Sequence, residues 1–471
     1  MQPVGQHRAH QGVVEQNASP FARLGDAGAG RFGQRRAPKK FGPTHHRVHR
    51  QASLKIFNHI CHDIIILMKA TARALSLLET GRIFIGQRLG PKTLPAVSPR
   101  RILILGYAAI GDCIFFLPVL EELRRRWPDA KITWLADCRP LIDELVPATG
   151  LVDEIWYRDW ENPDPRGAAD IQRRIREGNF DLALLSLSSP MHDFQGAIRD
   201  IPLRVGHCRA FGDFPPGWSG PRRAWWSLRR GMVTGELARR AVLNRKAWIA
   251  PGSEHAVWRN LRLLEALGIP KPEPARPRLP ARPADLSGLD PAKKRIAVHL
   301  GPPGNQYFKM WRPERFGRLC ALLSEAVSAE FVIVGAADES ASLEAARRAC
   351  APLRLHSRLG KCSLLETFGL LANCDLFIGN DTGLAKAAMA LGIPTVTVYG
   401  PTDPAELGIL WEPDKHLEVR TGISCSPCIR LGMAKAADLD YSNCGHHDCL
   451  EKLAPETVFA AIQAKYLRCL T

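Results

Sequence analysis

The strongest constraint on the fold is a pattern that occurs twice along the chain. Residues 100–137 contain an apolar strand at 102–106, a glycine-containing loop, a helix, and a second strand at 131–135. The same order returns later, from the strand 295–301 through a loop and the helix PERFGRLCALLSEA to the strand 331–336. A strand–helix–strand unit is the building block of a parallel sheet. The repetition predicts an α/β protein with two doubly wound, Rossmann-like domains.

Further elements extend both halves. We expect strands at 152–157, 180–187, 202–207 and 375–380, and helices near 339–350, 363–373 and 383–391. Residues 208–252, rich in Gly, Pro, Trp and Arg, are predicted to be a long irregular excursion. The predicted divisions are a disordered basic segment at 1–52, an amphipathic helical extension at 53–99, a first domain at 100–269, a Pro-rich linker at 270–294, and a second domain at 295–471. Two such domains would form a cleft between the carboxyl ends of their strands, where ligands of parallel sheets bind.

Charge and composition narrow the class of partner. The formal net charge is +17, from 64 basic and 47 acidic residues, which indicates an anionic partner: a nucleotide, a phosphorylated lipid, a membrane surface or a nucleic acid. The sequence has no apolar run of about 20 residues, so we expect no membrane span. The helical pattern at 53–84 suits either docking on the protein's own body or contact with a membrane surface or another subunit. Positions 1–20 lack the apolar segment of a secretory signal, which favours the cytosol and reduced thiols for the 13 cysteines.

Two strand-to-helix junctions carry the candidate chemistry. Asp112 follows the first strand of the first domain, and it is read either as a helix N-cap or as a general base facing the cleft. In FIGNDTGLAKAAMALGIPTVTVYGPTDP (377–404), Asp381 and Thr382 could likewise cap a helix, and Gly383 could merely relieve crowding. A helix N-terminus is also a natural site for a phosphate.

Basic side chains near the second junction strengthen the anion-site interpretation. Lys386 lies in the first turn, where a cation is unfavourable to the helix dipole, so we expect a negative group nearby. In the loop GPPGNQYFKMWRPERF (301–316), Gly304 would let the backbone approach a ligand and Lys309 could pair with phosphate, although a solvated lysine is an equal alternative. Neither a Gly-Lys-Ser/Thr phosphate loop nor a Gly-x-Gly-x-x-Gly fingerprint follows the leading strands, which argues against a P-loop NTPase and a classical NAD enzyme.

Three segments together resemble the family-nine glycosyltransferases, typified by ADP-heptose:lipopolysaccharide heptosyltransferases. They are ILILGYAAIGDCIFFLPVLEELRRRWPDAKITWL, VHLGPPGNQYFKMWRPERF and GNDTGLAKAAMALGIPTVTVYGPTDP, in the family's order and spacing, within 100–465. The resemblance implies a GT-B fold, with the acceptor on the first domain and the nucleotide sugar mainly on the second. It implies an inverting transfer from an ADP-sugar that requires no cofactor.

The resemblance also assigns roles to residues. Asp112 matches the catalytic base, and Lys309 matches a lysine that contacts the donor phosphates. Asp381 matches the carboxylate that holds sugar hydroxyls, with Thr382 and Gly383 on the phosphate side. The family usually has a histidine where this chain has Lys386, and the phosphate loop around Gly304 lacks the family's usual hydroxyl residues. These departures concern the identity of the sugar rather than the class of reaction.

The cysteine pattern near the C-terminus is a separate feature. Cys425, Cys428, Cys444 and Cys449 are spaced as metal ligands often are, so a structural Zn or Fe site, metal-free reduced thiols and disulfides all stay open. In a metal site, His446 or His447 could take the place of one of the four cysteines. Similar cysteine clusters occur in part of the resembled family, including members that glycosylate proteins.

The sequence leaves three functions to compare. The first is a cytoplasmic glycosyltransferase, peripheral on the inner face of the inner membrane, that moves a heptose or related sugar to a lipopolysaccharide core or lipid-linked saccharide. The second keeps the fold but uses a protein or another glycan as acceptor. The third is an inactive nucleotide- or nucleic-acid-binding homologue, which would use basic and aromatic stretches such as PRRAWWSLRR (221–230). We expect the first, without nucleic acid as a partner.

Overall fold

The computed structural model describes most of the chain after residue 97. The described residues are 98–106, 109–137, 142–158, 165–186, 194–208, 240, 242–249, 254–301, 307–429, 444 and 446–470. The predicted basic segment 1–52, nearly all of the extension 53–99 and most of the excursion 208–252 lie outside these residues.

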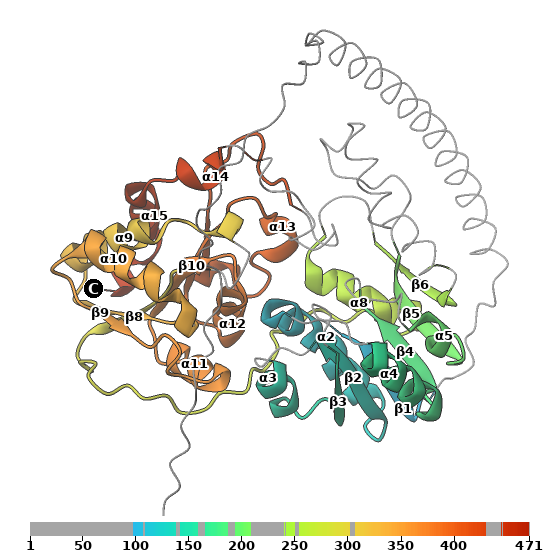
Figure 1. Cartoon of the computed structure of the whole chain (residues 1–471). Coiled ribbons are helices and arrows are strands. Elements are labelled where there is room, and N and C mark those ends of the chain that lie inside the picture. Colours follow the sequence, from blue (N-terminus) through green and yellow to red (C-terminus); the bar gives the residue numbers. More distant parts are fainter. Residues whose placement is uncertain are drawn as a thin grey trace, which may run out of the picture. The chain divides into compact units, whose positions relative to one another are not determined.

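The first half forms one parallel sheet with helices on its faces (Figure 1). Its six strands lie in the order β3-β2-β1-β4-β5-β6. They are β1 (Arg101–Leu105), β2 (Lys131–Asp137), β3 (Glu154–Arg158), β4 (Leu182–Leu185), β5 (Leu203–Cys208) and β6 (Arg245–Trp248). The helices are α2 (Ile110–Arg126), α3 (Ile142–Ala148), α4 (Pro165–Glu177), α5 (Gln195–Ile198) and α8 (Ala256–Ala266).

The second half repeats this architecture. Its six strands lie in the order β12-β11-β10-β7-β8-β9. They are β7 (Lys294–His299), β8 (Ala329–Ile333), β9 (Leu355–Ser357), β10 (Leu376–Asn380), β11 (Thr395–Val398) and β12 (His416–Val419). The helices are α9 (Pro313–Ala326), α10 (Ser340–Cys350), α11 (Leu364–Leu371), α12 (Gly383–Leu391), α13 (Pro404–Leu407), α14 (Asp448–Glu451) and α15 (Pro455–Leu470), with the 3₁₀ turns η1 (Tyr307–Lys309), η2 (Ala337–Glu339) and η3 (Pro413–Lys415).

The sequence of each central strand explains its position. β1 (RILIL) is buried along almost its whole length, and β10 (LFIGN) is buried throughout. Continuous apolar runs suit strands of a parallel sheet, because helices cover both faces. Two doubly wound parallel domains are therefore confirmed.

The prediction that residues 208–252 are irregular throughout is wrong. Residues 245–248 lie within the predicted irregular excursion, yet they form β6, which pairs with β5 at the edge of the first sheet. β6 reads Arg-Lys-Ala-Trp and buries only Ala247 fully. Polar residues are tolerated there because an edge strand faces water, and so the strand carries no alternating or continuous apolar signal.

The two halves share apolar packing. One cluster of buried side chains includes Phe115 on α2 together with Phe368 on α11 and Trp411 after α13. The rings of Phe115 and Trp411 lie 6.2 Å apart between centroids. The core of the first domain therefore continues into the second.

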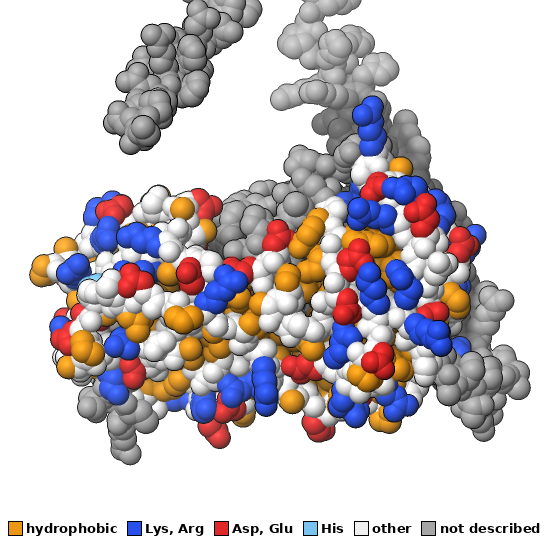
Figure 2. Space-filling model, turned by 90° about the horizontal axis from the view of Figure 1, so that it is seen from below, with side chains coloured by type: hydrophobic (Ala, Val, Ile, Leu, Met, Phe, Trp, Pro, Cys, Tyr) orange, Lys and Arg blue, Asp and Glu red, His pale blue; other side chains and the backbone are white. Residues whose placement is uncertain are grey.

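One face of the molecule carries both signs of charge. On the face in Figure 2, Lys and Arg side chains alternate with Asp and Glu over the described residues, with apolar side chains between them. Within the described part of the chain, no helix combines the length and the apolar character needed to cross a membrane.

Candidate functional site

The first junction places Asp112 inside the first turn of α2. The helix begins at Ile110, and Ala109 occupies the N-cap position with extended backbone dihedrals of φ −90° and ψ 143°. The interpretation of Asp112 as the N-cap is therefore wrong. A carboxylate in the first turn is favourable because it faces the positive end of the helix dipole. Asp112 is half-buried, at the carboxyl edge of the first sheet.

The second junction places Thr382 at the N-cap position of α12. Its backbone is extended, with φ −134° and ψ 172°, but its side chain makes no capping hydrogen bond to the helix. The helix ends at the predicted residue because Gly392 follows it with φ 77°, a left-handed conformation that favours glycine. The amides of the first turn of α12 thus lack a side-chain cap, which leaves them suited to an anion.

Glycines let these two junctions meet. A Cβ atom added to Gly383 would lie 2.9 Å from Ile110 Cβ and 3.2 Å from the Gly111 nitrogen. A Cβ added to Gly111 would lie 3.3 Å from Lys386 Cγ. Gly383 therefore does relieve crowding, and the crowding comes from α2 of the other domain. The N-termini of the two helices are in direct contact.

Asp381 lies at this contact and pairs with both predicted lysines. Lys386 Nζ is 2.6 Å from Asp381 Oδ1, and both side chains are about 97% buried, at 3% exposure each. Lys309 Nζ lies 3.4 Å from Asp381 Oδ2. Lys386 also donates a hydrogen bond of 2.7 Å to the Tyr399 hydroxyl, which donates to the Leu407 carbonyl at 3.1 Å. The negative group expected near Lys386 is therefore Asp381 itself.

Burial and charge act on this cluster in opposite directions. Burial raises the pKa of Asp381, but Lys386 and Lys309 outweigh it and hold that pKa below its ordinary value. Burial lowers the pKa of Lys386 despite the opposing effect of Asp381. Burial also raises the pKa of Tyr399 well above its ordinary value, so its hydroxyl stays protonated and can donate to Leu407. At neutral pH, Asp381 is a fixed negative charge between two lysines.

The loop that carries Lys309 is pinned to the same junction. Asn380, the last residue of β10, accepts a hydrogen bond of 2.8 Å from the Trp311 amide and donates one of 3.1 Å to the Leu300 carbonyl. Asn380 thereby fixes both ends of the loop between β7 and α9. Gly304, the other predicted residue of this loop, lies outside the described residues.

Sequence reasoning missed a buried polar network beside this loop. His299 at the end of β7 has Nδ1 3.0 Å from Thr382 Oγ1 and Nε2 3.3 Å from Glu339 Oε1. A single histidine in the apolar strand RIAVHLG carries no local signal of this role. Only the fold brings Thr382 and Glu339 to it, from separate strand ends.

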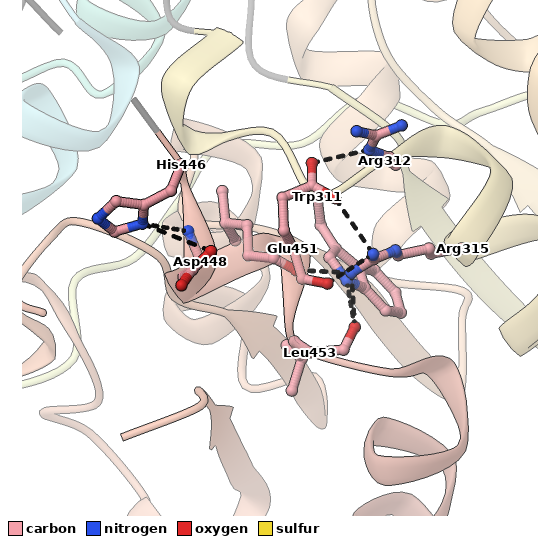
Figure 3. Close-up of polar contacts among 8 residues, drawn as sticks. Trp311, Arg312, Arg315, His446, Asp448, Glu451 and Leu453 are labelled. Atoms are coloured by element: carbon pink, nitrogen blue, oxygen red, sulfur yellow. Dashed lines mark hydrogen bonds and ion pairs between the residues drawn. The ribbon is translucent and has the colours of Figure 1, made fainter. Parts of the chain in front are cut away.

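The segment around α14 is attached to the start of α9 (Figure 3). Trp311 is fully buried, and its indole Nε1 donates to the Leu453 carbonyl at 3.0 Å. The Arg315 guanidinium donates to the carbonyls of Leu450 at 2.7 Å and Glu451 at 2.6 Å. Trp311 and Arg315 at the start of α9 thus bind the carbonyls of α14 and of the residues just after it.

The predicted cysteines lie in and just before α14 and in the segment that follows β12. Cys449 belongs to α14, and the amide of Cys428 donates to the Pro401 carbonyl at 2.9 Å. Burial, followed by the nearby thiols of Cys428, Cys444 and Cys425, raises the pKa of Cys449 to about 12. None of the four cysteines forms a disulfide, which contradicts the disulfide alternative. Among the described residues, no three His, Cys, Asp or Glu side chains are arranged to hold a metal ion.

The amino-acid sequence is similar to one protein family and to several heptosyltransferases. Residues 225–435 match the model of the family described as glycosyltransferase family 9 (heptosyltransferase). The lipopolysaccharide heptosyltransferase 1 of Pseudomonas aeruginosa is 26% identical over 341 residues, covering 70% of this chain and 86% of that protein. The lipooligosaccharide heptosyltransferase 2 of Haemophilus ducreyi is 23% identical over 392 residues, covering 76% and 97%.

Solved structures share the fold. The Escherichia coli ADP-heptose lipopolysaccharide heptosyltransferase II has a TM-score of 0.53 and 19% identity, covering 79% of this chain and 100% of that one. A family-9 glycosyltransferase from Veillonella parvula has a TM-score of 0.57 and 18% identity, covering 80% and 100%. The GT-B fold and the resemblance to the family-nine glycosyltransferases are confirmed.

Proposed function

We propose that this homologue of the family-nine glycosyltransferases transfers a heptose, with inversion, from ADP-heptose to a hydroxyl of a lipopolysaccharide core or lipid-linked saccharide. That the chain is a glycosyltransferase rests on its family-nine relatives. The observation that carries the assignment of the site is the contact between the two junctions. Gly383 of α12 lies against Ile110 and Gly111 of α2, so the first turn of α2, which contains Asp112, lies against the N-terminus of α12, the proposed anion site.

The proposed chemistry follows from the charges at this contact. Asp112 accepts the proton of the acceptor hydroxyl while that oxygen forms a bond to the anomeric carbon. The bond from the anomeric carbon to the phosphate oxygen breaks, and ADP leaves with its electron pair. The uncapped amides of α12 and the ammonium group of Lys309 stabilise the charge that develops on the diphosphate.

Asp381 is proposed to orient the donor sugar. Its Oδ1 is held by Lys386, so Oδ2 is the atom that is more available to sugar hydroxyls, with Lys309 at 3.4 Å. Lys386 then serves mainly to hold Asp381, and it acts on the diphosphate only through its charge. Thr382 and Gly383 contribute backbone amides, and Gly304 is proposed to let the phosphate loop approach the donor.

The test of this function separates binding from turnover. We would measure binding of ADP-heptose, ADP-glucose, UDP-glucose and ADP by calorimetry, and then turnover as ADP release with a heptose-free core acceptor. The Asp112→Asn variant keeps the side chain's shape but cannot accept the proton. We expect it to bind ADP-heptose as the unmodified protein does and to lose turnover by at least about 100-fold. Unchanged turnover would refute the role of Asp112, and failure of the unmodified protein to bind any of the nucleotides would refute the transferase assignment.

The proposed setting is the cytoplasm, with peripheral attachment to the inner face of the inner membrane. We propose that residues 100–269 receive the acceptor, residues 295–471 hold the nucleotide sugar, and residues 270–294 link them. The net charge of +17 would favour anionic lipid, where the lipid-linked acceptor lies. Sedimentation with vesicles should show binding to anionic vesicles that weakens with salt, and equal binding to neutral vesicles would contradict this electrostatic attachment.

We also propose that the four cysteines hold a structural Zn or Fe ion. The thiols of Cys428, Cys444 and Cys425 act on the pKa of Cys449, so the four side chains lie in one neighbourhood, and they would have to close around the ion to bind it. Four thiolates are a donor set that suits either metal. The metal would supply a cross-link between α14 and the loop at Cys425–Cys428, with no part in the transfer reaction. Elemental analysis of the purified protein should give about one metal ion per chain, and Cys449→Ser should lose it. Protein purified without metal and with four titratable thiols in the folded state would refute this proposal.

A further inference from the structure

The buried network around His299 joins three different strand ends. His299 ends β7, Thr382 follows β10, and Glu339 lies in the turn after β8. His299 is 3% exposed, and each of its ring nitrogens faces one partner, at 3.0 Å from Thr382 Oγ1 and 3.3 Å from Glu339 Oε1. β7 lies between β10 and β8 in the sheet, so the imidazole bridges from one neighbouring strand end to the other.

Glu339 is held by one oxygen only. Its Oε1 accepts hydrogen bonds from the Ala336 amide at 3.0 Å and from the imidazole. Its Oε2 is buried and has no hydrogen-bond partner among the described residues. That oxygen lies 3.6 Å from where a Cβ on Gly301 would stand, at the carboxyl end of β7. A buried carboxylate oxygen without a donor is costly, and a ligand hydroxyl would satisfy it.

The tautomer of His299 follows from its partners. An ionised carboxylate can only accept, so the ring nitrogen Nε2 carries the hydrogen. In the neutral ring, Nδ1 then accepts the hydroxyl proton of Thr382. The histidine thus fixes both the carboxylate of Glu339 and the hydroxyl of Thr382 in one orientation.

We propose that His299 is a positioning residue of the nucleotide-sugar site, which couples the helix end at Thr382 to the ligand-binding carboxylate Glu339. The inference rests on the proposed function. A diphosphate at the N-terminus of α12, after β10, leaves its nucleoside over the ends of β7 and β8, and there Glu339 Oε2 meets a ribose hydroxyl. In this proposal His299 does not contact the ligand. It holds Thr382 and the Glu339 carboxylate in the positions from which they bind the ligand.

Two substitutions of His299 each keep one of its two hydrogen bonds and remove the other. His299→Gln can reach Glu339 with its amide nitrogen, in the place of Nε2, but loses the contact with Thr382. His299→Asn can reach Thr382, in the place of Nδ1, but loses the contact with Glu339. The probes are ADP, 2′-deoxy-ADP and 3′-deoxy-ADP, with dissociation constants measured by calorimetry and folding checked by thermal unfolding.

We expect the unmodified protein to bind ADP about 5- to 10-fold more tightly than at least one deoxy nucleotide, which corresponds to one hydrogen bond. His299→Gln should keep this preference, and His299→Asn should lose it as Glu339→Ala does. Combining His299→Asn with Glu339→Ala should cause no further loss, because both remove the same interaction. A structural role alone would weaken all three nucleotides equally in both histidine variants.

The outcomes separate this inference from the proposed function. If His299→Asn keeps the full ribose preference, or if His299→Gln and His299→Asn behave alike, the positioning role is refuted while nucleotide binding stands. If the unmodified protein binds no ADP, the proposed function fails, and the inference fails with it. Should either histidine variant not fold, Thr382→Val and Glu339→Ala test the same coupling from outside β7: their effects on ADP binding must be less than additive, and additive effects refute it.

Discussion

Replacing Lys386 by Met tests how the buried charge cluster is held together. Met fills nearly the same volume but removes the ammonium group that lies 2.6 Å from Asp381 Oδ1. Asp381, at 4% exposure, then keeps a buried negative charge that is stabilised by Lys309, at 3.4 Å, and by a hydrogen bond from Thr402. Removing one partner of a buried pair costs about 3–5 kcal/mol, and the remaining lysine places the expected loss near 3 kcal/mol.

The expected loss is large enough to measure by thermal unfolding. For a domain of about 150–250 residues, 3 kcal/mol corresponds to a drop in Tm of about 6–12 °C. The matched control is Lys452→Met, because Lys452 pairs with Asp448 at the same 2.6 Å but its side chain is 65% exposed. An exposed pair contributes little to stability, so the control should shift the Tm far less than Lys386→Met does.

A second substitution shows whether the loss comes from the unpaired charge. Adding Asp381→Asn to Lys386→Met removes the buried charge and should recover more than half of the lost stability. The effect should also depend on pH. Because the folded state lowers the pKa of Asp381, the stability from its pairing is present above the ordinary aspartate range and is lost as pH falls through the folded pKa. The gap between Lys386→Met and the unmodified protein should therefore narrow in acid. A Lys386→Met protein as stable as the unmodified one at pH 7, or additive losses in the double variant, would refute this reasoning.

Three further substitutions test other contacts. Gly383→Ala places a Cβ 2.9 Å from Ile110 Cβ, so we expect a cost of about 1–3 kcal/mol in unfolding and lower turnover; normal values of both would mean that the junctions are not tightly packed. Glu144→Gln weakens hydrogen bonds from Ser363 Oγ at 2.7 Å and the Leu364 amide at 2.8 Å, and should lower the Tm by a few degrees without changing nucleotide affinity in calorimetry. Trp311→Phe removes the indole donor to Leu453, and should weaken ADP binding as well as stability, since the Lys309 loop loses its anchor; lower stability alone would separate the anchor from the site.

The sequence was informative wherever local chemistry decides the structure. Pro313 at the first position fixes the start of α9, and Gly392 in the left-handed conformation fixes the end of α12, so both helices have their predicted bounds. Apolar runs located β1 and β10 for the same reason, because both faces of these strands are buried.

Other features depend on partners that are distant in sequence. Asp112 follows the start of α2 because Ile110 and Gly111 already adopt helical geometry. The N-cap residue is Ala109, which gives no capping signal in the sequence. The link between His299 and Glu339 spans separate strand ends, and it exists only once β7 and β8 pair. The contact of Gly383 with Ile110 likewise requires both domains to be folded.

The apolar cluster that joins Phe115, Phe368 and Trp411 bears on how such enzymes can be recombined. A chimera that takes its first domain from one relative and its second from another cuts through this cluster and through the glycine contact between α2 and α12. A Cβ on Gly383 would lie 2.9 Å from Ile110 Cβ, so a larger residue on α12 has to be matched by a change on α2. Under the proposed binding of the acceptor by residues 100–269, exchanging the acceptor preference requires loops grafted around α2, with α2 and α12 kept together.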